Sequence, residues 1–149
     1  GPVRGMRNPL TQREREHYLA GRRVGLFGVE RIGKAPNVVP IWCDYEADGE
    51  LRVMTPRRSA KHKLLEREYR FSLCVQTESW PYRYVSVSGS VTSIEPRDET
   101  TVRSLVERYI PTSKVERFLD VIAGVDYLII RMRPEQWATS DVSKDDYLA

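Results

Sequence analysis

Basic and hydroxyl side chains gather where a short predicted strand, residues 51–55, leads into a helix. Ser59 is a suitable N-cap for a helix that we expect to run to about Glu68. The first turn of such a helix offers unpaired backbone N–H groups and the positive end of its dipole. Three basic side chains crowd the same place: Arg57, Arg58 and Lys61. The junction therefore predicts a site for a phosphate or another compact anion, although a solvated surface helix explains the same residues.

A second candidate segment is the run Val-Val-Pro-Ile-Trp at residues 38–42. Proline removes a donor from a strand ladder, so Pro40 is tolerated at a sheet edge or where something other than a strand packs on the backbone. A flat aromatic ligand would fit against this backbone, with Trp42 packed behind it. An edge strand with a core tryptophan is the alternative, and the sequence leaves both open.

The third candidate segment is the aromatic and proline-rich run at residues 80–84. Such a loop forms a pocket wall, a partner contact or simply a packed turn. No nucleophile elbow, Walker A motif, dinucleotide fingerprint or Ser–His–Asp spacing occurs in the sequence. If the protein is an enzyme, we therefore expect a bound cofactor to supply the reactivity.

Charge and cysteine content narrow the function classes. The net charge of +3 is too small for a duplex DNA binder, and the excess is local, so we expect no nucleic acid partner. Cys43 and Cys74 lie far apart in apolar runs, which favours two reduced core thiols in a cytoplasmic protein over a disulfide. His17 and His62 have no neighbours at ligand spacing, so we expect no metal, and no apolar run is long enough to span a bilayer.

The elements that must position these segments alternate between strands and short helices. Six strands are expected, at residues 24–29, 38–45, 51–55, 70–77, 84–94 and 127–132, the last closed by Pro134. Helices are expected after a capping box at Thr11, after Ser59, after Asp98 and in the run that Gly124 ends. Closure removes edge strands, so the pattern favours a mainly β protein with flanking helices and a closed, six-stranded antiparallel barrel.

The length of 149 residues predicts one domain. We place it at residues 11–140, between an N-terminal tail of residues 1–10 and a C-terminal tail of residues 141–149. Gly1-Pro2 is typical of the scar that a protease leaves after removal of an expression tag.

With these segments in place, the chain resembles the split β-barrel flavin- and deazaflavin-dependent oxidoreductases, the superfamily that includes pyridoxamine 5′-phosphate oxidase. More closely, it is similar to the short actinobacterial branch that uses the deazaflavin coenzyme F-420. The similarity spans about residues 11–139, and its markers are the runs at 36–42, 58–61, 81–89 and 131–135. The four markers occur in order at compatible spacing, which makes the set more specific than any one of them.

The resemblance implies an FMN-binding split barrel and a homodimer with two cofactor sites at its interface. It places Val39, Pro40, Ile41 and Trp42 beside the tricyclic ring. It places the cofactor phosphate at residues matching Thr55, Pro56, Arg57, Arg58, Ser59, Ala60 and Lys61. It completes the pocket with Gln76, Pro81, Tyr82 and Trp137, in part from the second subunit, with Tyr82 as a candidate proton donor.

Three positions depart from the pattern of that branch. Trp80 stands where a second proline is frequent, Ser88 replaces a frequent glutamate, and Leu64 replaces a frequent asparagine. The change at Trp80 would reshape the substrate pocket. The C-terminal arginine and histidine pattern of true pyridoxamine phosphate oxidases is missing, which argues against vitamin B6 oxidation.

The function implied is hydride transfer from reduced F-420 to an unsaturated organic substrate, which the sequence does not identify. Lys63 and Arg67, one turn apart on the basic helix, could meet the polyanionic tail of that cofactor as diffuse charge. Two alternatives stay open. One is an FMN-dependent oxidoreductase of the same fold, and the other is a non-catalytic carrier of flavins, tetrapyrroles or lipids.

Overall fold

The structure is a computed structural model that describes residues 8–46 and 49–144, without the side chains of Ala60 and Lys61. The described part contains four α-helices: α1 (Gln12–Ala20), α2 (Ala60–Glu68), α3 (Glu99–Tyr109) and α4 (Val115–Val121). It contains seven strands: β1 (Gly25–Val29), β2 (Asn37–Ile41), β3 (Cys43–Tyr45), β4 (Leu51–Pro56), β5 (Arg70–Thr77), β6 (Arg83–Pro96) and β7 (Tyr127–Asp141). Short 3-10 turns, η2 (Thr112–Lys114) and η3 (Val142–Lys144), precede α4 and follow β7.

All seven strands form one antiparallel sheet in the order β2-β1-β5-β6-β7-β4-β3. The mainly β class with flanking helices is confirmed, but the expected six strands and closure are wrong. The single strand expected at residues 38–45 is divided at Trp42, so that β2 pairs with β1 and β3 pairs with β4. No ladder joins β2 to β3 within the described residues, and the two strands are the ends of the sheet order.

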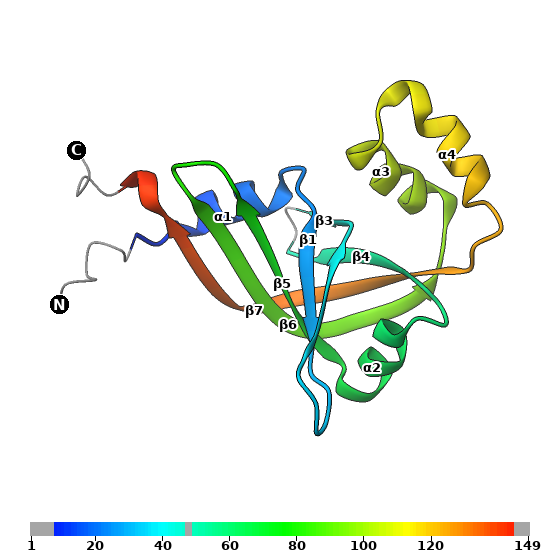
Figure 1. The fold of residues 1–149 in the computed structure, drawn as a ribbon, viewed down its shortest axis with the longest axis horizontal. Coiled ribbons are helices and arrows are strands. Elements are labelled where there is room, and N and C mark those ends of the chain that lie inside the picture. Colours follow the sequence, from blue (N-terminus) through cyan, green and yellow to red (C-terminus); the bar gives the residue numbers. More distant parts are fainter. Residues whose placement is uncertain (1–7, 47–48, 145–149) are drawn as a thin grey trace.

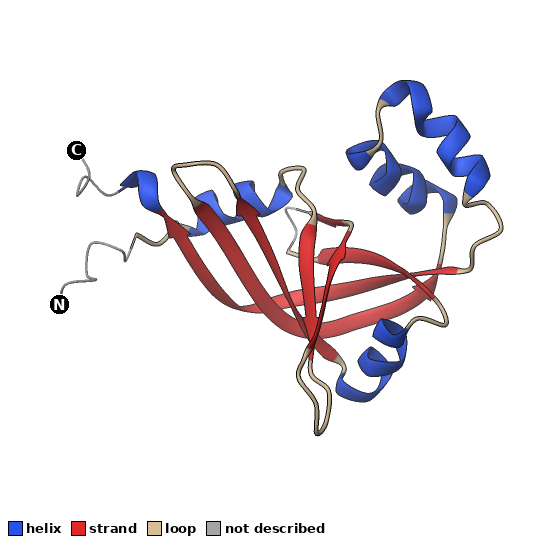
Figure 2. Ribbon diagram, in the orientation of Figure 1, coloured by secondary structure: helices blue, strands red, loops and turns tan. Residues whose placement is uncertain are grey.

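The two longest strands, β6 and β7, form the spine of the molecule. Figure 1 shows them running the length of the sheet, with α1 near one end and the α3–α4 pair at the other. Figure 2 shows the helices placed around the rim of the sheet. The helices therefore cover different parts of one curved sheet.

Strand β7 continues through Pro134, where the sequence predicts its end. Ser88 of β6 pairs with Gln136, and Gly89 pairs with Pro134, so Glu135 is the extra residue of a β-bulge. A bulge interrupts the ladder locally, which is where a strand tolerates proline. Gly89 is required there, because a Cβ atom on it would lie 1.9 Å from the carbonyl oxygen of Arg133.

The apolar side chains form two clusters. The larger one fills the inside of the sheet beneath α1 and α2, around residues such as Phe27, Leu73 and Ile130. The smaller one lies beneath α3 and α4, around Leu105 and Ile129. The packing of α3 and α4 on the end of the sheet thus has its own core.

The helix starts follow the sequence signals. Thr11 and Glu14 form the predicted capping box of α1, and the side chains of Ser59 and Asp98 cap α2 and α3. Gly21 caps the end of α1 as expected, but α4 ends at Val121, before Gly124. No helix in the described residues is both long and apolar enough to cross a bilayer.

Candidate cofactor-binding site

The junction between β4 and α2 is held by a short chain of polar contacts. The Oγ atom of Ser59 accepts a hydrogen bond from the backbone N–H of His62 at 3.1 Å and lies 3.0 Å from Oγ1 of the buried Thr55. Only one of the two hydroxyl hydrogens is used between these oxygens, so one O–H remains to donate to a ligand. The imidazole Nδ1 of His62 contacts the carbonyl oxygen of Arg57, and Nε2 lies 2.8 Å from Glu66.

The basic side chains of this junction differ in how they are engaged. Arg57 forms an exposed ion pair with Asp126 at 2.7 Å, and its backbone N–H donates to the carbonyl oxygen of the same residue. Arg58 and Lys63 are exposed and have no ion pair with any described residue. An anion would therefore find Arg58 available, whereas it would compete with Asp126 for Arg57. The predicted contributions of Ala60 and Lys61 lie outside the described side chains.

Strand β2 is an edge strand, which explains how it accommodates Pro40. Pro40 pairs with Leu26 of β1, and no second strand pairs with β2 in the described residues. The side chains alternate: Val38 and Pro40 are exposed, Val39 is half-buried and Ile41 is buried. Residues of β2 also contact β4, which leads into the Ser59 junction. The strand that carries the ring-binding candidates is therefore a neighbour of the strand that leads into the phosphate-binding candidates.

Trp42 lies between the two halves of the divided strand and packs behind β2, against the α3–α4 pair. Its ring stacks on Tyr109 with centroids 5.0 Å apart and an interplanar angle of 13°. It also contacts Phe118 of α4 at 5.5 Å. A packed Trp42 agrees with a strand that binds a flat ligand and equally with a plain edge strand. Its packing alone therefore does not choose between these two interpretations.

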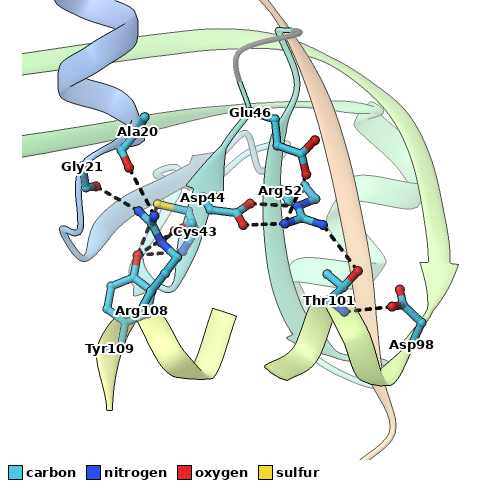
Figure 3. A network of polar contacts seen from close by, with 10 residues as sticks. All are labelled: Ala20, Gly21, Cys43, Asp44, Glu46, Arg52, Asp98, Thr101, Arg108 and Tyr109. Atoms are coloured by element: carbon cyan, nitrogen blue, oxygen red, sulfur yellow. Dashed lines mark hydrogen bonds and ion pairs between the residues drawn. The ribbon is translucent and has the colours of Figure 1, made fainter. Parts of the chain in front are cut away.

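Tyr109 and Arg108 form a polar anchor that the sequence does not single out (Figure 3). The Tyr109 hydroxyl lies 2.7 Å from the carbonyl oxygen of Cys43. It lies equally close to that of Arg23, so its one hydrogen is shared between the two. The Arg108 guanidinium donates to the same Cys43 carbonyl and to the carbonyls of Ala20 and Gly21. Burial raises the pKa of Tyr109 to about 12 and that of the Cys43 thiol to about 11. The anchor fixes the backbone beside Trp42 and holds both groups neutral.

A buried ion pair continues this network on the other side of β3 (Figure 3). Arg52 of β4 donates two hydrogen bonds to Asp44, at 2.6 and 2.9 Å, and a longer one to Thr101 of α3. The bonded carboxylate of Asp44 raises the pKa of the Arg52 guanidinium. The helical stripe of α3 signals its core side chains, but no local sequence pattern signals these long-range contacts.

Gln76, Pro81 and Tyr82 lie at the far end of the sheet from α2, whereas Trp137 pairs with Val87, level with the middle of β5. Strand β5 starts directly after α2 and ends at Thr77, and eight extended residues span about 25 Å. Gln76 is exposed near that far end, and the loop beyond it contains a cis peptide bond between Trp80 and Pro81. One chain does not bring Gln76, Pro81 or Tyr82 to the Ser59 junction, as Figure 1 also shows for the two ends.

The side chains of Tyr82 and Trp137 are partly engaged. Tyr82 is 52% exposed and contacts Trp80 edge-to-face, with ring centroids 5.3 Å apart. Trp137 of β7 is half-buried against the larger core cluster, and the Arg15 guanidinium lies 4.4 Å over its ring. Tyr82 is thus open to a ligand or partner, whereas Trp137 presents only part of its ring.

Two hollows among the described residues are not lined by any candidate cofactor residue. A polar hollow of about 610 Å³ lies on the outer face of the sheet between Gly28 and Gln136, beside the end of α2. A second hollow, of about 420 Å³ and mixed polar and apolar lining, lies between α1 and Arg83. An edge strand and a surface junction cannot enclose a ring alone, so a cofactor there would need a further wall.

Comparison with known proteins identifies the fold. No protein-family model and no curated protein matches the chain. A solved structure named F420 reductase matches with a TM-score of 0.66 and 23% identity, over 83% of this chain and 94% of that one. The conserved hypothetical protein Rv2991 from Mycobacterium tuberculosis matches with a TM-score of 0.71 and 19% identity, over 91% and 87% of the two chains. A FAD-binding protein from Mesorhizobium loti gives 0.63 and 20%, over 90% and 96%.

These neighbours share the split β-barrel fold of flavin-binding proteins that resemble pyridoxamine 5′-phosphate oxidase. The predicted split-barrel fold class is therefore confirmed, but with seven strands in an open sheet instead of six in a closed one. At such low identities the likeness establishes the fold, and the activity has to be argued from the site.

Proposed function

We propose that this protein is an oxidoreductase that uses reduced coenzyme F-420 to transfer a hydride to an unsaturated organic substrate. The observation that carries the proposal is the contact of the edge strand β2 with β4, whose end leads into the cationic Ser59 junction. A flat ring would lie along the exposed side of β2, with its phosphate at Arg58 and the hydroxyl pair of Thr55 and Ser59. Lys61 is proposed as a further phosphate ligand from its place in the sequence.

We propose a homodimer in which each cofactor site is built from both protomers. The outer face of β1 and β2 is unusually apolar, with Leu26 40% exposed and Val38 60% exposed. Exposed apolar patches of this kind favour a protein partner. The loop from Trp80 to Tyr82 of the second protomer would then supply the wall that a single chain lacks.

When bound, reduced F-420 would supply the hydride, and the residues of this chain would orient it. The backbone of residues 39–41 would hold one face of the ring, and Trp42 would support that strand from behind through Tyr109 and Phe118. The second protomer would exclude water and hold the acceptor carbon close to the ring. The exposed hydroxyl of Tyr82 is our candidate to deliver the proton to the substrate.

The same proposal places residues 11–140 in a single cofactor-binding domain and the protein in the cytoplasm. Its two cysteines are both free, one buried and one half-buried, which a reducing compartment maintains.

Parallel titrations of the purified protein with F-420 and with FMN test this function. We expect saturable binding of F-420 at micromolar concentrations, weaker binding of FMN, and oxidation of reduced F-420 with a panel of enones and quinones. Tighter binding of FMN would assign the flavin instead, since the FAD-binding neighbour has the same fold. Tight binding of F-420 without turnover would point to a carrier, and binding of neither cofactor would refute the proposal.

A further inference from the structure

An apolar groove lies along the connection from α3 to α4, away from the candidate cofactor residues. Its walls are the side chains of Ile110, Pro111, Phe118 and Val121, and its volume is about 520 Å³. Val121 is 72% exposed, although valine is among the residues most often buried. The volume falls within the range of small-molecule sites, about 300–1,000 Å³.

Two cations, Lys114 and Arg117, complete the lining of this groove. Both are exposed, and neither forms an ion pair with a carboxylate of the described residues. Arg103, on the same pair of helices, instead holds Glu116 at 2.6 Å and Glu107 at 3.7 Å. The groove therefore combines apolar walls with two cations that form no ion pair within the described residues.

We infer that this groove binds an amphipathic carboxylate, a small molecule with an acyl or aryl chain and one anionic head. The apolar chain would lie against Phe118 and Val121, and the carboxylate would be bound by Lys114 and Arg117. Arginine and lysine bind carboxylates through charge-assisted hydrogen bonds, which are stronger than neutral ones. An uncharged apolar ligand would leave the two cations unused, and a polar anion would leave the apolar wall exposed to water.

Phe118 connects the groove with the strand that we propose for the cofactor ring. It lines the groove on one side and contacts Trp42 at 5.5 Å on the other. Because Phe118 contacts Trp42, a ligand in the groove would change the surroundings of the Trp42 indole ring, which directly follows β2. The inference does not depend on the identity of the cofactor, because the fluorescence of Trp42 would report ligand binding to the groove when no cofactor is bound.

The test is a titration of the full chain with decanoate, below its micelle concentration, followed by calorimetry and tryptophan fluorescence. We expect one saturable site per chain, a change in Trp42 emission, and affinity that rises about two- to fourfold per added methylene from octanoate. Decanol should bind at least tenfold more weakly than decanoate. A Trp42→Phe variant should keep the calorimetric signal and lose the change in emission.

Matched variants separate this groove from general detergent binding. The double variant Lys114→Gln/Arg117→Gln should weaken decanoate binding about tenfold, whereas Arg13→Gln/Arg22→Gln on and beside α1 should leave it unchanged. Val121→Asp should abolish binding without unfolding the chain, because that side chain is already exposed. Equal affinity in the two double variants would overturn the inference. The inference would also be overturned if the ligand-free chain self-associates and Val121→Asp abolishes that self-association. A second copy of the chain would then be the occupant of the groove.

Discussion

At the scale of single residues, the most constrained position is Cys43. Its thiol is buried, and its backbone carbonyl accepts hydrogen bonds from both Tyr109 and Arg108. The next residue, Asp44, forms an ion pair with Arg52 on the opposite side of the strand. The three residues of β3 are therefore fixed by contacts to α1, β4 and α3, and β3 in turn fixes the position of Trp42.

The raised pKa of Cys43 predicts a loss of stability in alkali. The thiol titrates near 9.0 when unfolded and near 11 when folded, so its contribution is complete below pH 9 and is lost as the pH rises through 11. The loss should reach about 2–3 kcal/mol, from about 1.4 kcal/mol per pKa unit. Urea unfolding between pH 8 and 11 measures this slope.

Two cysteine variants make that measurement specific. Cys43→Ala should flatten the slope between pH 9 and 10, below the range in which the raised pKa of Tyr109 adds its own loss. Cys74→Ala should keep most of that slope, because Cys74 is only half-buried and its pKa is less affected. An unchanged slope in Cys43→Ala would show that the buried thiol is not its source.

The ion pair of Asp44 and Arg52 predicts a large cost for removing one partner. Their side chains are only 9% and 11% exposed, so Asp44→Asn leaves a nearly buried guanidinium without its main partner. We expect a loss of about 3 kcal/mol in the free energy of unfolding. Glu46→Gln removes the outer, 47% exposed partner of the same arginine and should cost less than about 1 kcal/mol. Similar losses in the two variants by chemical denaturation would contradict this account.

At the scale of elements, the β-bulge between β6 and β7 decides how far the sheet extends. It allows β7 to pass Pro134 and reach Asp141, where β6 and β7 still pair beside the loop that carries Tyr82. The bulge depends on the absence of a side chain at Gly89. The long spine of the sheet thus depends on the glycine that pairs with Pro134.

Glycine-to-alanine variants test this dependence. Gly89→Ala should destabilise the protein by about 1–3 kcal/mol, because the new methyl group collides with the backbone of Arg133. Gly124→Ala meets no atom within 4 Å and should be neutral or stabilising by up to about 1 kcal/mol. Thermal unfolding of both variants measures the difference. If Gly89→Ala were as stable as Gly124→Ala, the bulge would not depend on the missing side chain at Gly89.

Local signals predicted most elements, because caps, period-two alternation and helical stripes are written in neighbouring residues. The starts of α1, α2 and α3 and the path of β6 follow from such signals. The break at Trp42 and the passage of β7 through Pro134 do not, since each depends on a partner distant in sequence. The residues of the β4–α2 junction are neighbours in the sequence, so the junction could be proposed from the sequence. The anchor at Tyr109 joins segments that are far apart in the sequence, so it could not.

At the scale of the whole molecule, the candidate residues are spread along the length of β5. The phosphate candidates lie at the end beside α2, and Gln76 and Tyr82 lie near the far end. Val39 and Pro40 of β2 lie between them, level through β1 with Leu73 and Cys74. The proposed site is thus spread over the sheet of a single chain, and in the proposed homodimer two protomers packed in opposite directions would assemble two complete sites. The proposal therefore predicts that tight cofactor binding requires dimerisation.

The most direct test of this account is the affinity of the protein for F-420 when a single charge of the junction is removed. Arg58 is exposed and has no ion pair with a described residue, so Arg58→Gln should leave the fold intact. We expect Arg58→Gln to weaken F-420 binding about tenfold or more, from the loss of a charge-assisted hydrogen bond to phosphate. Arg13→Gln, on α1 at the other end of the sheet, should bind F-420 like the unmodified protein. Equal F-420 affinities of the two variants would contradict the placement of the cofactor at the β4–α2 junction.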